Sequence, residues 1–373
     1  MMKKVLNTFL ATILVTNLCA QEIPAKFRKI QKHMDKAVDA GLSGLVISVK
    51  HSKLGEWTGV SGYANKEKAE LMRENHVMAL ASISKTFTAV ATMLLVEDGK
   101  IELDKPVGDY LSDEIVGDLP NTEKLLVRNL LNMTSGLVNY ERDSTLNAIY
   151  LSGRLSLDTL SHLEAIQRYV VGKPALFEPG ERYSYSSTNY LLLSLIMDEV
   201  LGGYHGDFYR ERIFKPLNLK NTYYRETPGS NHVATYGDLD RNGEQDDITD
   251  MTIETTNWFI GDDGVYADAK DALHFMESLF KGKIVSAESL EQMKTWVNDD
   301  YGFGITYDKG FPFKELMGHS GVGIGTTTDS YYFPSKDMTV AILSNSGIRA
   351  SPRKYRKAYY KMQTKVMMTL FLF

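Results

Sequence analysis

The sequence predicts an α+β fold in which one antiparallel sheet is built from both ends of the chain, flanked by helices and interrupted by a mostly helical insertion. Two observations lead to this prediction. Strand-like segments lie within residues 44–65 and return within 301–345, whereas the stretch from about residue 103 to 298 shows mainly helical spacing of apolar side chains. We expect one folded unit over residues 21–373, with an α/β lobe (21–100 and 300–373) and a helical lobe (101–299).

The first twenty residues have the layout of a secretory signal peptide. Lys3 and Lys4 precede an apolar run that is short for a membrane span, and the small residue Ala20 ends it. We expect cleavage after Ala20 and a secreted or periplasmic protein with no stable membrane span; retention as an anchor is the alternative. The only cysteine, Cys19, leaves with this segment, so the mature chain has no thiol for catalysis or metal binding.

Helices and strands then follow in a simple order. Residues 23–41 show helical spacing and end at a glycine, and residues 44–50 and 57–65 have the pattern of a strand hairpin. A helix too apolar for the surface is predicted from Ser82 to a stop at Gly99. Further helical patterns occupy residues 125–137, 190–203 and 271–282, strand patterns occupy 301–308, 323–334 and 338–345, and a helix over 352–373 closes the chain.

Charge and composition exclude several partners. The net charge is −5, and the lysines and arginines are scattered along the sequence, so we expect no nucleic-acid partner. We expect no cofactor and no metal. The segment 238–247 places Asp238, Asp240, Asn242 and Asp246 around Gly243, as in the first part of a calcium loop, but an acidic solvated turn is the favoured interpretation.

A serine three residues before a lysine occurs three times: Ser82–Lys85, Ser278–Lys281 and Ser351–Lys354. Residues three apart share a helical face, and the N–H groups of a first helical turn are free to stabilise negative charge. Only the first copy stands at the predicted start of a buried helix. We therefore expect Ser82 to be a nucleophile with Lys85 beside it, and the other two copies to be accidental.

Two later segments supply what a serine mechanism still needs. Tyr185 precedes a small polar cluster that includes Ser187, and a tyrosine beside a cationic lysine ionises more easily and serves as a general base. The segment His319–Val322, with Ser320 and Gly321 inside it, stands at the entrance of a strand, where a free N–H is able to complete an oxyanion hole. Taken alone, a serine- and tyrosine-rich helix cap explains the first segment equally well, and a histidine in a glycine-rich turn is more often structural.

Taken in order, the motifs Ser82-Ile83-Ser84-Lys85, Tyr185-Ser186-Ser187 and His319-Ser320-Gly321 resemble the serine β-lactamase and D-Ala-D-Ala carboxypeptidase family, in its class C-like branch. Supporting segments such as "LLNMTSGL" and "GDDGVYADAKDALHF" extend the resemblance over nearly the whole mature chain. It implies a β-lactamase/transpeptidase-like fold, Ser82 as the acylated nucleophile, Lys85 as its activator and Tyr185 as the proton shuttle. It also implies an oxyanion hole made by the N–H groups of Ser82 and Val322.

The sequence departs from this family at the position of Ser187, where an asparagine is usual, and carries His319 where many members have lysine. A shorter side chain and a neutral imidazole grip a substrate amide and carboxylate less firmly. We therefore expect a peptidase or amidase of the D-Ala-D-Ala carboxypeptidase type, acting on a small or peptidoglycan-derived peptide. An esterase or a weak β-lactamase is the alternative, and a penicillin-binding sensor is the non-enzymatic one. The oligomeric state is left open.

Overall fold

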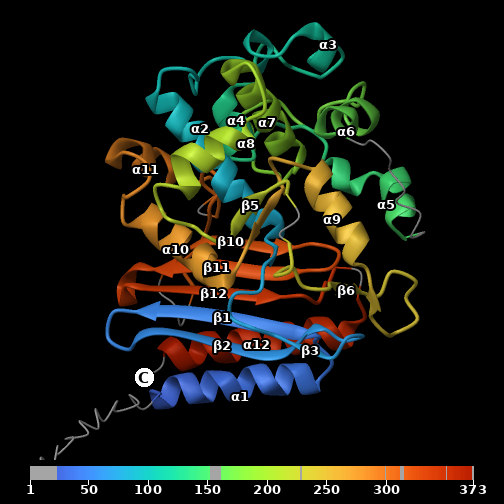
Figure 1. Cartoon of the computed structure of the whole chain (residues 1–373). Helices are drawn as coiled ribbons and strands as arrows, with labels where there is room; N and C mark the ends of the chain where they lie inside the picture. The colour runs from blue at the N-terminus through green and yellow to red at the C-terminus, as the bar shows by residue number, and fades with distance from the viewer. Residues whose placement is uncertain are drawn as a thin grey trace, which may run out of the picture.

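A seven-stranded antiparallel sheet forms the centre of the protein, as seen in a computed structural model that describes residues 23–151, 161–226, 229–298, 300–310, 315–349 and 351–371 (Figure 1). Its strand order is β3-β2-β1-β12-β11-β10-β9, so strands from the two chain ends meet where β1 pairs with β12. The strands are β1 Gly44–His51, β2 Gly55–Asn65, β3 Glu70–Leu71, β9 Thr306–Asp308, β10 Leu316–Val322, β11 Thr327–Phe333 and β12 Met338–Ser344. The predicted fold class and the sheet shared between the chain ends are confirmed.

One face of the sheet is covered by the first and last helices, α1 (Ala25–Asp39) and α12 (Arg353–Phe371), which lie side by side (Figure 1). Apolar side chains of both helices pack against β1, β11 and β12 in one buried cluster that includes Phe27, Ile47 and Tyr359. The register agrees with this packing, because Ile47 of β1 faces Ile342 of β12 across the ladder.

The other face carries the remaining helices and the larger core. Helix α2 (Ser84–Glu97) is buried at 12 of its 14 positions, which confirms that it is an interior helix. Helix α10 (Ala269–Phe280), although it comes from the middle of the chain, lies on the sheet over β1, β11 and β12. The other helices are α3 Asp113–Val116, α4 Val127–Leu131, α5 Ser144–Leu151, α6 His162–Tyr169, α7 Thr188–Leu201, α8 Gly206–Tyr209, α9 Thr249–Trp258 and α11 Ala287–Met293.

The insertion contains short strands as well as helices. β4 (Met78–Ala79), β8 (Val265–Ala267) and β5 (Thr222–Tyr224) form a three-stranded sheet, and β6 (Tyr236–Gly237) pairs with β7 (Asp246–Asp247). Strands of two or three residues carry no measurable period, which is why the sequence did not reveal them. The lobe boundaries at residues 100 and 300 stay a prediction.

The acidic segment 238–247 forms the turn that follows β6, and its last two residues, Asp246 and Asp247, are strand β7. Asp240 accepts a hydrogen bond from the Asn242 N–H (3.1 Å) and Asp238 accepts one from the Gly243 N–H (3.0 Å), so two of the carboxylates close the turn. Among the residues that the structure describes, no group of three or more Asp, Glu, His or Cys side chains is arranged to hold a metal ion.

The predicted signal peptide at residues 1–20 lies outside the described residues. Within the described ranges, each helix is too short or too polar to cross a membrane.

Candidate active site

Ser82 lies on a tight turn that leads into α2. The sequence predicts a helix from Ser82 itself, but residues Ala81–Ile83 form a 3-10 turn and the α-helix begins at Ser84. Ala81 has a φ of +49°, a left-handed conformation that costs an alanine about 1 kcal/mol and that tertiary contacts must hold. The turn leaves Ser82 partly exposed, with its Oγ 3.0 Å from the Lys85 Nζ.

The other two Ser-x-x-Lys pairs are separated by their surroundings. The Ser278 hydroxyl is buried, while Lys281 forms ion pairs with Glu277 and Asp337. Ser351 donates to the Gly347 carbonyl, and Lys354 pairs with Glu244 at 3.1 Å. The structure therefore brings the serine and lysine side chains into contact at Ser82–Lys85. In the other two pairs the lysines, Lys281 and Lys354, form ion pairs with carboxylates instead.

Lys85 is fully buried and surrounded by acceptors. Its Nζ donates to the Asp262 carbonyl oxygen (3.2 Å) and lies 3.6 Å from the Asp262 carboxylate Oδ2. Burial by itself lowers the pKa of Lys85, but Tyr185 and the carboxylates of Asp262 and Glu141 more than offset this effect and raise the pKa above its ordinary value. Lys85 is therefore a cation in the resting site.

Tyr185 completes the central group. Its phenol oxygen is hydrogen-bonded to the Ser82 hydroxyl and to Lys85, and its ring centroid lies 5.3 Å from the Lys85 Nζ. Burial raises the pKa of Tyr185 above its ordinary value, and the neighbouring Lys85 and the bond from Ser82 offset this rise only in part, so the tyrosine does not ionise more easily here as the sequence led us to expect. The three residues predicted to carry the chemistry thus form one connected hydrogen-bonded unit.

Asp262 belongs to this site, although the sequence analysis did not select it. Its Oδ2 accepts a hydrogen bond from the Tyr140 hydroxyl (2.9 Å), whereas its Oδ1 is buried without a hydrogen-bond partner among the described residues. Burial raises the pKa of Asp262 to about 6, with Lys85 opposing the rise. No local sequence pattern could have identified Asp262 as a neighbour of Lys85, because 177 positions separate the two residues.

Ser187 is engaged by a second acidic residue. Its Oγ donates to the Glu141 Oε2 (3.1 Å), and the Arg349 guanidinium donates to the Glu141 Oε1 (2.9 Å). Burial by itself raises the pKa of Glu141, but Arg349 and Lys85 more than offset it and hold that pKa below its ordinary value. The serine that stands in the usual asparagine position therefore contacts a carboxylate, and Glu141 and Arg349 are further residues that the sequence did not reveal.

His319 lies deeper than expected. Its Nδ1 is 2.6 Å from the Ser320 carbonyl oxygen, which only accepts, so Nδ1 carries the proton and Nε2 accepts a hydrogen bond from the Tyr301 hydroxyl (3.3 Å). Burial, followed by the charge of Lys85, lowers the pKa of His319 to about 3. The imidazole is neutral and packs beside Tyr185, with their ring centroids 6.3 Å apart.

The next residues of β10 divide between the two faces of the sheet. Ser320 is hydrogen-bonded to Tyr331, which packs with the α1 and α12 cluster, so its side chain points away from Ser82. A Cβ on Gly321 would lie 2.3 Å from the Leu80 carbonyl oxygen, which shows that this glycine allows β10 to approach the Ser82 turn. Val322, the last residue of β10, lines the cavity described next.

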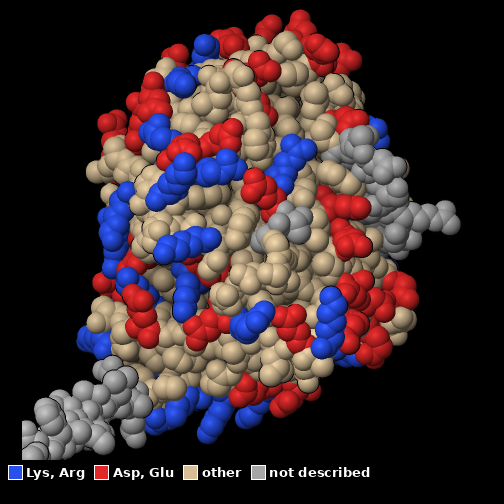
Figure 2. Space-filling view, in the orientation of Figure 1, with Lys and Arg blue, Asp and Glu red and all other residues tan. Residues whose placement is uncertain are grey.

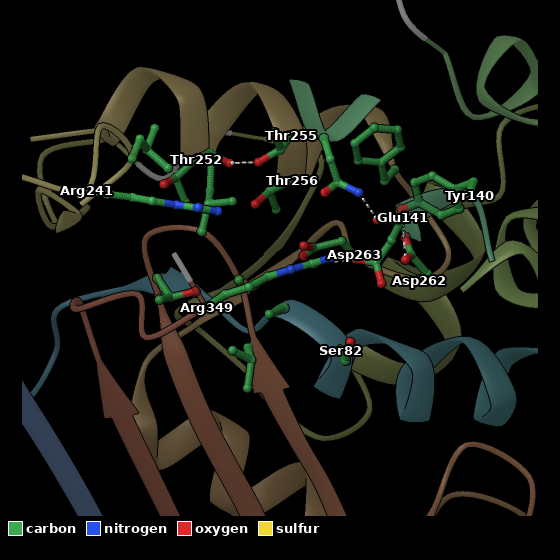
Figure 3. A pocket seen from close by; sticks show the side chains of 18 residues that line it. Ser82, Tyr140, Glu141, Arg241, Thr252, Thr255, Thr256, Asp262, Asp263 and Arg349 are labelled. Atoms are coloured by element: carbon green, nitrogen blue, oxygen red, sulfur yellow. Dashed lines mark hydrogen bonds and ion pairs between the residues drawn. The ribbon is translucent and has the colours of Figure 1, made fainter. Parts of the chain in front are cut away.

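A cavity of about 300 Å³ opens beside Ser82. Figure 3 shows Ser82 below it, the carboxylates of Glu141, Asp262 and Asp263 above Ser82, and Arg241 and Arg349 extending in from the far end. Burial, with the charge of Asp262, raises the pKa of Asp263 to about 7. The rest of the wall is mainly Val322 and Ile324 from the sheet edge together with Tyr140, Thr252, Thr255, Thr256 and Phe259.

Comparisons with known proteins agree with this geometry. A family model described as Beta-lactamase matches residues 27–363. The chain is 26% identical over 327 residues to Penicillin-binding protein 4* of Bacillus subtilis, covering 82% of this chain and 68% of that protein. It is 23% identical over 371 residues to a putative D-alanyl-D-alanine carboxypeptidase of Escherichia coli O157:H7, covering 86% of this chain and 82% of that protein.

A solved structure of similar fold is the D-stereospecific amidohydrolase from Streptomyces sp. It superposes with a TM-score of 0.77 at 26% sequence identity and covers 89% of this chain and 97% of its own. The family match spans most of the chain and includes the Ser82 turn, α2 and the strand that carries His319. The chain therefore belongs to the beta-lactamase family and is a serine hydrolase.

Proposed function

We propose that the protein hydrolyses D-amino-acid peptides or amides through an acyl-enzyme on Ser82. The observation that carries this proposal is the position of the Ser82 Oγ. It lies 3.0 Å from a buried cationic lysine, is hydrogen-bonded to Tyr185 and stands in the wall of a cavity of about 300 Å³. Nucleophile, proton acceptor and substrate space are thus adjacent, as nucleophilic catalysis requires.

In the acylation step, Ser82 Oγ forms a bond to the acyl carbon and gives its proton to the ionised form of Tyr185. Lys85 remains protonated, because Asp262 and Glu141 lie beside it, and its charge stabilises the ionised tyrosine. The carbonyl electrons move to the oxygen, which we assign to the N–H groups of Ser82 and Val322, two residues of the cavity wall.

The leaving nitrogen then takes the proton from Tyr185 as the carbon–nitrogen bond breaks. In deacylation a water molecule gives a proton to Tyr185 and adds to the acyl carbon, and the Ser82 Oγ recovers the proton as the ester bond breaks. Each half-reaction returns Tyr185 and Lys85 to their starting protonation states, so the two side chains act as one proton-transfer unit.

The cavity favours an acyl group that carries a free amine. Three carboxylates, Glu141, Asp262 and Asp263, face it, and Asp262 Oδ1 has no hydrogen-bond partner among the described residues. An ammonium group would satisfy this buried oxygen, and its charge would be compensated there. Similarity to a putative D-alanyl-D-alanine carboxypeptidase and to a D-stereospecific amidohydrolase supports the D-configuration.

Ester hydrolysis is the second candidate, because a small ester needs only the nucleophile, the proton path and the oxyanion hole. We expect weak or no turnover of β-lactams. The buried neutral His319 gives a substrate carboxylate no cation, and the Ser187 hydroxyl is engaged by Glu141. Neither group is available in the form that would hold a carboxylate and an amide firmly.

Two measurements test the proposal. Labelling with a fluorophosphonate, followed by peptide mapping, should place the label on Ser82 and should fail in Ser82→Ala; label on Ser278 or Ser351 would contradict it. The second measurement compares kcat/KM for D-alanine p-nitroanilide, its L-isomer, a D-Ala-D-Ala peptide, p-nitrophenyl acetate and nitrocefin. We expect the D-amino-acid substrates to have the highest kcat/KM. A kcat/KM for nitrocefin about a hundredfold above theirs, roughly 2.7 kcal/mol of transition-state preference, would show instead that the substrate is misassigned.

Export is a separate part of the proposal. It rests on the sequence pattern of residues 1–20 alone. N-terminal sequencing of the protein purified from the envelope of its own host should begin at Gln21, and a start that retains Phe9 would refute cleavage.

A further inference from the structure

Helices α1 and α12 gather cations from opposite ends of the sequence onto one face. Together they contain eleven Lys and Arg residues and two Asp residues, a net charge of +9. The whole chain has a net charge of −5, so all other residues together carry −14. The basic residues are scattered along the sequence, but the fold places residues 25–39 beside 353–371 and so gathers eleven of them in space.

The cations lie on the outer side of both helices. The apolar positions of each helix are buried against the sheet, and the basic residues of α12 are all exposed: Arg353, Lys354, Arg356, Lys357, Lys361 and Lys365. Figure 2 shows Lys and Arg side chains projecting from the lower edge of the molecule, where α1 lies. Within the two helices, Lys354 pairs with Glu244, whereas Lys32, Lys36, Lys361 and Lys365 are exposed and take part in none of the ion pairs found among the described residues.

Cations from both helices lower the pKa of the same histidine, His33. His33 of α1 is partly buried, and burial followed by the charges of Lys365, Lys29 and Lys36 lowers its pKa. A cation of α12 and two cations of α1 therefore act on the same imidazole, which shows that their fields overlap in one patch.

Apolar side chains project from the same layer. Tyr360 and Met368 of α12 are 49% and 41% exposed, and Ile23, just before α1, is 51% exposed. The C-terminal end of α12 lies beside the N-terminal end of α1 (Figure 1), which brings Ile23 and Met368 to the same end of the layer. A surface that combines many cations with separate exposed apolar and aromatic side chains is typical of binding at a membrane interface.

We propose that the outer face of α1 and α12 binds the surface of an anionic phospholipid bilayer. The +9 charge attracts acidic headgroups, and Ile23, Tyr360 and Met368 insert among them. The two adjacent helices form a broad layer on the sheet, and their exposed cations can face the flat surface of a bilayer together. Helix α2, which directly follows Ser82, lies on the opposite face of the sheet from α1 and α12 (Figure 1), so we expect the Ser82 cavity to stay open to soluble substrate while the protein is bound.

The test is co-sedimentation of the full chain with vesicles of phosphatidylcholine alone or with one third phosphatidylglycerol. A triple variant, Lys32→Gln, Lys361→Gln and Lys365→Gln, removes three exposed cations of the face. The matched control, Lys100→Gln, Lys220→Gln and Lys283→Gln, makes the same charge change at exposed lysines outside the two helices. Every variant carries the same residues 1–22, so differences between variants belong to the folded protein.

We expect the chain to prefer anionic vesicles, and the preference to fall as salt is added. At about 1 kcal/mol for each basic residue near an acidic surface, the triple variant should bind anionic vesicles about a hundredfold more weakly, while the control changes less than about threefold. Tyr360→Ser with Met368→Ser keeps the charge and should weaken binding about tenfold. Thermal melting of each variant establishes that it is folded.

Two outcomes would overturn the proposal. The first is equal binding to neutral and anionic vesicles, or equal losses in the helix variant and its control. The second is a soluble partner: double-stranded DNA or polyphosphate binding that the triple variant abolishes, together with vesicle binding that Tyr360→Ser and Met368→Ser leave unchanged.

Discussion

Replacing Asp262 with asparagine removes a buried carboxylate from the side of Lys85 while keeping the shape of the side chain. The Asp262 Oδ2 and Lys85 Nζ lie 3.6 Å apart, and both side chains are almost fully buried. With an effective dielectric constant of about 20, two unit charges at this distance interact by about 4.6 kcal/mol, which corresponds to about 3 pKa units. Glu141 remains on the same side of Lys85, so we expect a fall of about two to three units in the Lys85 pKa.

The expected consequence is a shift of the pH–rate profile. In the proposed mechanism the reactive form has a cationic Lys85 and an ionised Tyr185. Adding one proton gives the inactive form with neutral Tyr185, and removing one gives the inactive form with neutral Lys85. Both limbs of the bell-shaped profile therefore belong to the coupled pair. Removing a neighbouring negative charge lowers both pKa values, so the whole bell should move toward acid, and the alkaline limb by about two to three pH units.

The assay is kcat/KM for p-nitrophenyl acetate from pH 5 to 11, because a neutral ester keeps substrate charge out of the comparison. Asp263→Asn is the matched control, since Asp263 lies in the same cavity without an ion pair to Lys85 among those described. We expect its profile to move by less than about one pH unit. A folded Asp262→Asn protein whose profile superimposes on that of the parent would refute the reasoning.

Three further predictions concern other parts of the structure. Gly321→Ala places a Cβ 2.3 Å from the Leu80 carbonyl oxygen, so fluorophosphonate labelling should slow at least tenfold as β10 moves away from the Ser82 turn; normal labelling by a folded variant would contradict this. Glu141→Gln should raise KM for D-alanine p-nitroanilide relative to p-nitrophenyl acetate, and Arg349→Met should lower it, each about tenfold, because the two side chains carry opposite charges at the cavity; changes in the same direction would exclude the charge argument. Burial raises the pKa of Asp329 from 3.8 to about 7, so the folded state resists its ionisation and stability should fall as pH rises from about 4 to 7; chemical denaturation of Asp329→Asn should lack this decline.

The sequence predicts the fold because its main elements have clear periods. Strands β1 and β12 are mostly apolar and buried along nearly their whole length, and α2 is mostly apolar and buried on all sides, so each element suits an interior position. The contact between Ser82 and Lys85 follows from helical spacing, although the 3-10 geometry of the turn does not. The left-handed Ala81 is imposed by tertiary contacts, which no pattern of neighbouring residues encodes.

The charged neighbours of Lys85 could not be predicted in the same way. Asp262 and Arg349 come from loops and Glu141 from a short 3-10 turn, and each is a common residue type in a surface-like stretch of sequence. Their roles arise only when folding removes water from around them. His319 illustrates the reverse case: the sequence analysis expects a neutral imidazole near substrate, and the structure directs its two nitrogens to the Ser320 carbonyl and the Tyr301 hydroxyl.

The charges around Lys85 explain how this site tolerates serine where its family usually has asparagine. An asparagine side chain would be neutral, and the Ser187 hydroxyl in its place donates a hydrogen bond to the Glu141 carboxylate. Two carboxylates, Asp262 and Glu141, then supply the negative environment that keeps Lys85 protonated. Carboxylates hold a buried cation more strongly than an amide does, but they also make the cavity repel anionic acyl groups. On the proposed function we therefore expect Asp262 and Glu141, which lie around Ser187, to direct the site toward neutral or cationic substrates.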